Sequence, residues 1–296
     1  MTDVSRDRLH VATVNILNLA DRWPERLPLL LADMAALQPD VLALQEVVFV
    51  MQQDRLIGAA GEGQYTSVRG WAGRPEYGNS LVIRQPLEAR DVDRLDLGLD
   101  RAAHRLIVDL PGGGSVVAVA THLHHPGPEE AARDEQTARL VEWLEAAPAA
   151  TGMMVMGDFN ADPGEPTYRR MEAAGFRSVY AAVHGEDPDV TWPSGLQAPA
   201  MDTDGIPECL DYIWIRGASR PTRWSVSGRN DDMTPFTSVG PRPAARTSTT
   251  ARSWSPLRST SIVDRCGMIA RASAREAIPT SSSSRAVISS IRPGRP

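Results

Sequence analysis

The chain has 296 residues, of which 42% are hydrophobic, so it is long enough to bury one sizeable core. Its only cysteines are Cys209 and Cys266, which excludes a disulfide framework and a thiolate zinc site. The net charge of −6 is unevenly spread, because from residue 240 onward there are 10 Arg against Asp264 and Glu276. The acidic body of the chain, residues 1–239, lacks the positive field of a strong general DNA-binding surface. Its charge is still compatible with a small phosphorylated substrate.

The first ten residues, MTDVSRDRLH, are charged and lead directly into a strand-like run. No apolar span long enough to cross a membrane follows anywhere in the sequence. We therefore expect a cytoplasmic, monomeric protein that does not associate with membranes.

Strand and helix patterns alternate along the chain. Residues 9–17 alternate like a strand, residues 24–37 have helical apolar spacing behind a Pro, and residues 40–47 again predict a strand. Further strands are predicted at 79–84, 105–110, 115–123, 152–159 and 210–217, and further helices at 129–147 and 163–175. Strands outnumber helices and there is no Gly-rich phosphate loop, which favours packed sheets flanked by helices over a Rossmann fold.

Polar residues follow the apolar runs where the predicted strands begin or end. These residues are Asn15, Glu46, His122, Asp158, Asn160 and Asp211. Strand ends are rigid platforms that can direct side chains from distant parts of a chain into one cleft. Carboxylates suit a hard divalent cation, an imidazole suits phosphate contact or proton transfer, and amides orient oxygens. The pattern indicates a catalytic or binding site.

Each of these signals also has a simpler explanation when taken alone. Glu46 fits a solvated strand end, the GDFN segment fits a turn, and the histidines of THLHH fit structural roles. Asp211 fits a strand cap. The ordered recurrence of all of them at strand ends favours the functional explanation.

The succession TVNILN, LQEV, THL, GDFNADP and CLDYIWI resembles the endonuclease/exonuclease/phosphatase family of metal-dependent phosphoesterases, over roughly residues 9 to 230. The resemblance implies a four-layer α/β sandwich, in which two mixed β-sheets pack face to face between helices. It also implies hydrolysis of a phosphodiester or phosphomonoester by an activated water, with Mg²⁺ or Mn²⁺ as the cofactor. The implied substrate is a phosphorylated small molecule or a nucleic acid, and the resemblance does not choose between them.

The resemblance also assigns roles to single positions. Glu46 is expected to be the main metal ligand, with Asn15 beside it and Asp158 close to the cation. His122 is expected to contact the scissile phosphate, and Glu76, in RPEYGNSLVI, is expected to orient that histidine. Asp158 is also expected to act with Asn160 in positioning and activating the attacking water.

The chain departs from the family at its C-terminal signature. Members end with Ser-Asp-His, and Asp211 is expected to hold that histidine in its productive tautomer. The six histidines here are His10, His104, His122, His124, His125 and His184, so none follows Asp211. If Arg242 uses a CGN codon, the codons of residues 239–245 can spell Ser-Asp-His-Gly-Leu-Leu in the adjacent reading frame. We therefore hypothesise an insertion or deletion within roughly 225 to 238.

Two units follow from this hypothesis. Residues 1–230 are expected to form the catalytic domain, and residues 231–296 a low-complexity basic tail that is out of frame and disordered. The last core strand is then expected to be missing and the activity impaired. A disordered basic tail that belongs to the protein stays open, and so does a non-catalytic phosphate-ligand binding module or a degenerate pseudoenzyme on the same fold.

Overall fold

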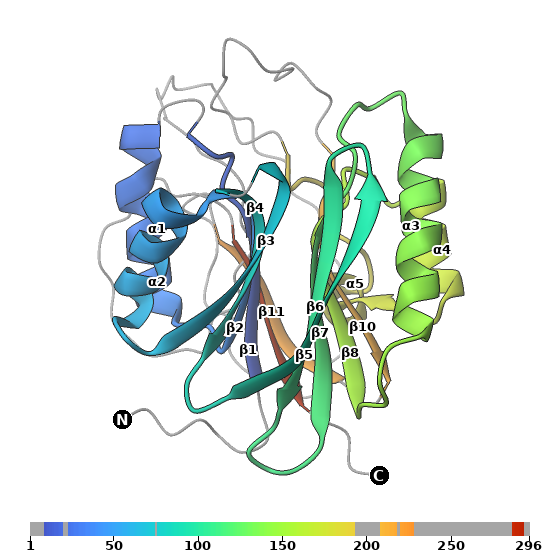
Figure 1. Ribbon diagram of the computed structural model, residues 1–296. Coiled ribbons are helices and arrows are strands. Elements are labelled where there is room, and N and C mark those ends of the chain that lie inside the picture. Colours follow the sequence, from blue (N-terminus) through green and yellow to red (C-terminus); the bar gives the residue numbers. More distant parts are fainter. Residues whose placement is uncertain are drawn as a thin grey trace, which may run out of the picture.

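The protein folds into two β-sheets that lie face to face, as the computed structural model in Figure 1 shows. The structure describes residues 9–19, 23–74, 76–192, 208–217, 220–227 and 286–292. The first sheet has the order β11-β12-β1-β2-β4-β3, with β1 at Leu9–Asn15, β2 at Val41–Val48, β3 at Tyr65–Arg74, β4 at Tyr77–Arg84, β11 at Arg220–Ser227 and β12 at Ala286–Arg292. The second sheet has the order β5-β6-β7-β8-β10-β9, with β5 at Glu88–Gly98, β6 at Arg101–Asp109, β7 at Ser115–His122, β8 at Gly152–Asp158, β9 at Arg177–Ser178 and β10 at Asp211–Gly217.

Helices cover the outer faces of the two sheets (Figure 1). Helices α1 (Trp23–Leu37) and α2 (Asp54–Gly61) lie on the first sheet, and α3 (Glu130–Glu145) and α4 (Pro166–Ala173) on the second. The π-helical segment η1 (Phe49–Gln53) leads into α2, and α5 (Val179–His184) follows β9. None of the helices in the described ranges is both long enough and apolar enough to cross a membrane. The predicted four-layer α/β sandwich is confirmed.

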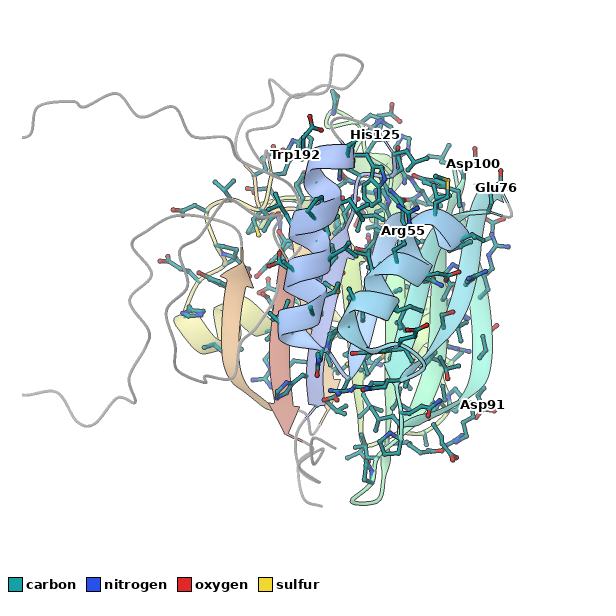
Figure 2. The ribbon with its side chains drawn as sticks, turned by 90° about the vertical axis from the view of Figure 1, so that its left-hand side faces the viewer. Arg55, Glu76, Asp91, Asp100, His125 and Trp192 are labelled. Carbon is teal, nitrogen blue, oxygen red and sulfur yellow. The ribbon has the colours of Figure 1, made fainter. Side chains whose placement is uncertain are left out.

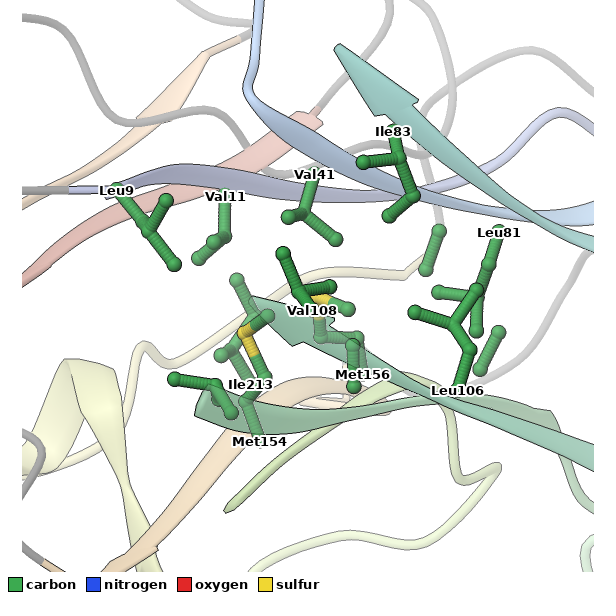
Figure 3. Close-up of a cluster of buried hydrophobic side chains, with 14 of the residues drawn as sticks. Leu9, Val11, Val41, Leu81, Ile83, Leu106, Val108, Met154, Met156 and Ile213 are labelled. Atoms are coloured by element: carbon green, nitrogen blue, oxygen red, sulfur yellow. The ribbon is translucent and has the colours of Figure 1, made fainter. Parts of the chain in front are cut away.

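Three apolar clusters separate the four layers. The central cluster joins the two sheets and includes Val11, Val41 and Leu81 of the first sheet against Val108 and Met154 of the second (Figure 3). A second cluster lies between the second sheet and α3 and α4, and a third between the first sheet and α1 and α2. Strands covered on both faces need nearly continuous apolar sequence, which explains why the central strands were recognisable from the sequence.

The sequence-based expectation that the last core strand is missing is wrong for the first sheet. The place beside β1 is not left without a strand, because β12, residues 286–292, pairs antiparallel with both β1 and β11. The sequence of this segment, AVISSIR, contains Val287, Ile288 and Ile291, and β-branched residues favour strands. A hydrogen-bonding edge next to β1 is available to such a segment, so pairing supplies the structure that the tail's composition did not predict. Residues 228–285 lie outside the described residues.

Strand direction brings the predicted site to one end of the sandwich. β1 and β2 run parallel, with Asn15 opposite Gln45, and β7 and β8 run parallel, with His122 opposite Asp158. The neighbouring strand β10 is antiparallel and begins at Asp211, directly opposite Asp158. The carboxyl ends of four strands and the start of β10 therefore share one edge.

Candidate active site

Asn15 joins the two sheets at this edge. Its Nδ2 donates a hydrogen bond of 2.8 Å to Oδ2 of Asp158 and one of 3.3 Å to Oε1 of Glu46. Asn18 Nδ2 donates to the other Glu46 oxygen at 2.9 Å. Two carboxylates from different sheets thus face one amide, and the predicted cluster of Asn15, Glu46 and Asp158 is present.

The backbone around these residues has an unusual conformation. Glu46 has a φ of +54°, and Leu17 and Asn18 have φ values of +51° and +36°, a region that side-chain-bearing residues seldom adopt. The loop after β1 is held by Arg26 of α1, which is fully buried and donates to the carbonyl of Ile16 at 2.6 Å. Such a conformation persists only where the surroundings enforce it, as this buried guanidinium does.

Asp158 is buried, with 7% of its surface exposed, and it is fixed by its neighbours. The backbone N–H of Asn160 donates to its Oδ1 at 2.8 Å, while Asn160 Nδ2 donates to the carbonyl of Leu123 at 3.0 Å. Burial raises the pKa of Asp158 to about 6; the hydrogen bonds from Asn15 and Asn160 oppose this rise, and the charge of Glu46 adds to it. The carboxylate is therefore poised to accept a proton near neutral pH.

His122 lies between Asp158 and a guanidinium. Its Nε2 is 3.7 Å from Oδ2 of Asp158, and Arg101 Nη1 lies 3.0 Å from its Nδ1 and 3.2 Å from its Nε2. Nη2 of the same arginine is 3.1 Å from Nδ1 of His125. Burial, followed by the charges of Arg101 and His125, lowers the pKa of His122 well below its ordinary value of 6.5. The site therefore combines a carboxylate, an amide, imidazoles and a guanidinium, which are the groups that bind phosphoryl oxygens and move protons.

The remaining predicted residues lie at different distances from this centre. Asp211 is buried opposite Asp158, and its backbone N–H donates to Oγ1 of Thr191 at 3.2 Å. Glu76 is exposed just before β4, and its carbonyl accepts a hydrogen bond of 3.0 Å from the N–H of Phe49. Within the described residues, the polar partners of the His122 ring are Arg101 and Asp158, not Glu76. Asp211 is brought into the site, whereas an orienting contact from Glu76 is not seen.

The donor set fits a hard divalent cation. The carboxylates of Glu46 and Asp158 converge on the Nδ2 of Asn15, and the charge of Glu46 raises the pKa of Asp158, so a cation between the carboxylates would relieve repulsion between like charges. Mg²⁺ is commonly bound by one or two carboxylates together with substrate phosphate oxygens. No cluster of three or more His, Cys, Asp or Glu side chains with metal-binding geometry occurs in the described part of the chain. A cation held by Glu46 and Asp158 would take its remaining ligands from water and substrate.

Sequence patterns missed three contributors to the site. Arg101 begins β6, His125 lies in the loop after β7, and Tyr77 begins β4. Burial and then the charge of Glu46 raise the pKa of Tyr77, whose hydroxyl hydrogen-bonds Glu46. The one available signal was position, because each of the three lies within three residues of a strand boundary at the edge that carries the predicted residues.

The chain is similar to known proteins in sequence and in fold. The sequence model of the endonuclease/exonuclease/phosphatase family matches residues 12–249. A curated relative, the uncharacterized protein YbhP of Escherichia coli strain K12, is 30% identical over 151 residues, which are 49% of this chain and 54% of YbhP. The chain thus spans about half the length of the curated relatives it matches.

Solved structures share the fold. The human Nocturnin catalytic domain with bound sulfate anion has a TM-score of 0.59 at 22% identity, covering 77% of this chain and 88% of that one. D. rerio TDP2 complexed with single strand DNA product has a TM-score of 0.61 at 16% identity, covering 76% of this chain and 92% of that one. The family match covers most of the sequence, so the chain belongs to the endonuclease/exonuclease/phosphatase family, whose activity is phosphoester hydrolysis of the nuclease and phosphatase type and generally depends on a divalent metal.

Proposed function

We propose that this chain hydrolyses a phosphoester bond of a phosphorylated small molecule or nucleic acid by in-line attack of water, with Mg²⁺ or Mn²⁺ as cofactor. The observation that carries the proposal is the meeting of both sheets at Asn15, whose amide contacts Glu46 and Asp158. His122 lies 3.7 Å from the same Asp158 oxygen. Asn15 thus connects the carboxylates of Glu46 and Asp158 on the metal side, and the imidazole of His122 on the phosphate side lies next to Asp158.

Each site residue has a proposed role that follows from its position. Glu46, Asn15 and Asp158 would hold the cation, which supplies charge stabilisation to the phosphoryl oxygens when it is bound. Asp158 and Asn160 position the attacking water, and Asp158 accepts its proton. His122 and Arg101 donate hydrogen bonds to the phosphoryl oxygens, which carry more charge in the transition state than in the substrate.

The ligands of similar structures support this substrate class. The human Nocturnin catalytic domain holds a sulfate anion, and D. rerio TDP2 is complexed with a single strand DNA product. Net charge favours a small substrate here, because the acidic body of the chain does not attract polyanions regardless of sequence. We further propose that the protein acts in the cytoplasm as a monomer, which cell fractionation and size-exclusion chromatography test.

A second candidate is a phosphate-binding protein with little or no catalysis. It is favoured by the absence of any histidine after Asp211, where the family has a proton-transfer residue. Removal of a general acid or base typically lowers the rate ~10²- to 10⁴-fold. We propose that the chain as given is impaired to that degree.

A phosphoester panel tests the proposal. It covers single-stranded nucleic acid, abasic duplex, nucleotides, inositol phosphates and sphingomyelin, each with Mg²⁺, with Mn²⁺ and with EDTA. We expect hydrolysis of at least one class that EDTA abolishes and that Glu46→Gln and Asp158→Asn remove. The exposed Glu88→Gln is the control and should leave the rate unchanged. Metal-independent binding of inorganic phosphate without hydrolysis in any class would instead establish the binding protein.

A further inference from the structure

One guanidinium joins two imidazoles at the site. Arg101 directs Nη1 to His122 at 3.0 Å and Nη2 to Nδ1 of His125 at 3.1 Å. The two histidines differ in surroundings, because His122 is 3% exposed in β7 whereas His125 is exposed in the following loop. Figure 2 shows His125 at the same end of the molecule as Glu76 and Asp100, with Asp91 at the opposite end. His125 is therefore the imidazole of this pair that is more accessible to solvent.

The loop that carries His125 is held on both sides. Before it, Asn160 Nδ2 donates to the carbonyl of Leu123 at 3.0 Å, and the N–H of His124 donates to Oε1 of Gln136 at 2.9 Å. After it, Nη1 of the fully buried Arg133 donates to the carbonyl of Pro126 at 2.6 Å. A side chain on a backbone fixed in this way keeps its direction, as general acids and bases require.

Four groups form a chain of contacts across the site. Asp158 lies at one end, followed by His122 at 3.7 Å, then Arg101, and His125 lies at the other end. A phosphoryl group bound by His122 and Arg101 would contact the middle of this chain, with Asp158 and His125 as its two ends. In-line displacement needs the attacking and leaving oxygens on opposite sides of phosphorus.

The charges around His125 change when a phosphate binds. Burial, followed by the charges of Arg101 and His124, lowers the pKa of His125 below 6.5. The charges of Glu46 and Glu129 raise this pKa. His122 lies on the other side of Arg101. A phosphate paired with Arg101 offsets the arginine's charge and brings negative charge beside the imidazole. Both changes favour the protonated form of the His125 ring. Substrate binding therefore promotes protonation of His125.

We infer that His125 is the general acid for the leaving group, an inference that rests on the proposed phosphoester hydrolysis. Water attacks phosphorus and gives its proton to Asp158, the bond from phosphorus to the leaving oxygen breaks, and the Nε2 proton of His125 passes to that oxygen. The products are the phosphate and a neutral alcohol. The proton on Asp158 returns to solvent and His125 takes one up again, so the cycle is balanced.

The neighbouring His124 provides a matched control. Its Nε2 is 2.9 Å from Oε2 of Glu129, and its ring lies 5.9 Å from that of His125. It has the same chemistry and nearly the same position, but it contacts Glu129 where His125 contacts Arg101. We therefore compare His125→Gln with His124→Gln in the full chain.

The test compares esters that differ only in the leaving group. The pairs are 4-nitrophenyl phosphate with ethyl phosphate, and the 4-nitrophenyl with the ethyl ester of thymidine 5′-phosphate. A good leaving group needs no protonation, so His125→Gln should lower kcat on the ethyl ester by ~10²- to 10⁴-fold and on the 4-nitrophenyl ester far less. The unaltered chain should lose activity on the ethyl ester as pH rises past the His125 pKa, and His125→Gln should lack this decline.

The outcomes separate the inference from the proposed function. Equal losses on both esters of a pair would mean that His125 binds substrate without donating a proton, which overturns the inference alone. An equal and selective loss in His124→Gln would also overturn it. If the unaltered chain hydrolyses neither ester of either pair and no substrate of the phosphoester panel, the proposed function and this inference fall together. If it hydrolyses another class of the panel, the ethyl and 4-nitrophenyl esters of that class form the pair for this test.

Discussion

The amide of Asn15 donates a 2.8 Å hydrogen bond to the carboxylate of Asp158, 143 positions away in the chain. This bond connects the end of β1 in one sheet to the end of β8 in the other. The same Nδ2 lies 3.3 Å from Glu46, so a single donor serves two negative groups. The position of these acids therefore depends on how the two sheets pack.

Replacement of Asn15 tests this dependence. Asn15→Ala leaves buried Asp158 with one donor fewer, and an unsatisfied buried acceptor typically costs ~1 to 3 kcal/mol of unfolding free energy. Displacement of a catalytic group by about 1 Å can cost ~10²-fold in rate, so kcat/KM should fall to that extent. Urea denaturation and steady-state kinetics measure the two effects. Asn18→Ala removes a donor to Glu46 and a side-chain hydrogen bond with Tyr77 but no donor to buried Asp158, so it should cost less stability than Asn15→Ala. Equal urea midpoints for Asn15→Ala and the unaltered chain would contradict the first expectation.

Gly157 has a steric reason to precede Asp158. Its φ is +153°, and a Cβ at this position would lie 2.0 Å from the carbonyl oxygen of Thr121 on the paired strand β7. Gly157→Ala must therefore push β7 and β8 apart just where His122 faces Asp158. We expect an unfolding free energy lower by at least ~1 to 3 kcal/mol, together with loss of hydrolysis.

A second glycine supplies the opposite expectation. Gly58 is exposed in α2, and no atom lies within 4 Å of the Cβ position. Alanine is favoured over glycine in helices, so Gly58→Ala should raise the unfolding free energy by ~0.5 to 1 kcal/mol without affecting the rate. Thermal and urea unfolding of both variants measure the contrast. A Gly157→Ala protein as stable as the Gly58→Ala protein would show that β7 and β8 tolerate separation.

His104 should make the fold sensitive to acid. It is 3% exposed beside Gly70, and burial, followed by the charge of Arg94, lowers its pKa to about 4 from 6.5. Because the folded pKa lies below the unfolded one, the unfolded chain binds the proton more readily. The stability linked to this group is complete above 6.5, declines as pH falls below that value, and is lost below about 4, a difference of ~3 kcal/mol.

The measurement is urea unfolding of the unaltered chain and of His104→Leu between pH 4 and 7. Other groups, including Asp158, titrate in the same range, so the difference between the two proteins is the informative quantity. That difference should change by ~3 kcal/mol in favour of the leucine variant as pH falls. A difference that does not vary with pH would mean that His104 is not held neutral by burial.

The sequence predicted the central strands well, for a physical reason. β1, β2, β7 and β8 are buried on both faces, so their apolar runs are nearly uninterrupted and their polar ends stand out. Because paired parallel strands end at one edge, Asn15, Glu46, His122 and Asp158 were expected together and are found together. The helix predicted at 129–147 is α3, with its ends shifted by one or two residues.

The elements that were missed owe their structure to their neighbours. β5 has seven exposed residues at its start and no apolar alternation, so pairing with β6 specifies it. The turn between these strands places Leu99 and Asp100 at φ values of +53° and +56°. Neither residue is an Asn or a Gly, the residues that would indicate such a turn in the sequence. Arg101, which follows directly, could not be assigned to the site without that turn. β12 is a similar case, since its place beside β1 depends on an edge that lies far away in the sequence.

The hypothesis of a shifted reading frame can be tested in the gene. No histidine follows Asp211, and the codons of residues 239–242 are expected to contain TCGGACCAC or a synonym in the adjacent frame. Restoring that frame by a single-nucleotide change upstream should add the family's Ser-Asp-His signature and raise kcat/KM by ~10²- to 10⁴-fold, the usual contribution of a general acid or base. The control is the restored chain with the new histidine changed to Ala, which should return to the rate of the present one. A gene sequence without that codon run would refute the frameshift. Equal turnover by the restored and present forms with Mg²⁺ would instead refute the proposed impairment of activity.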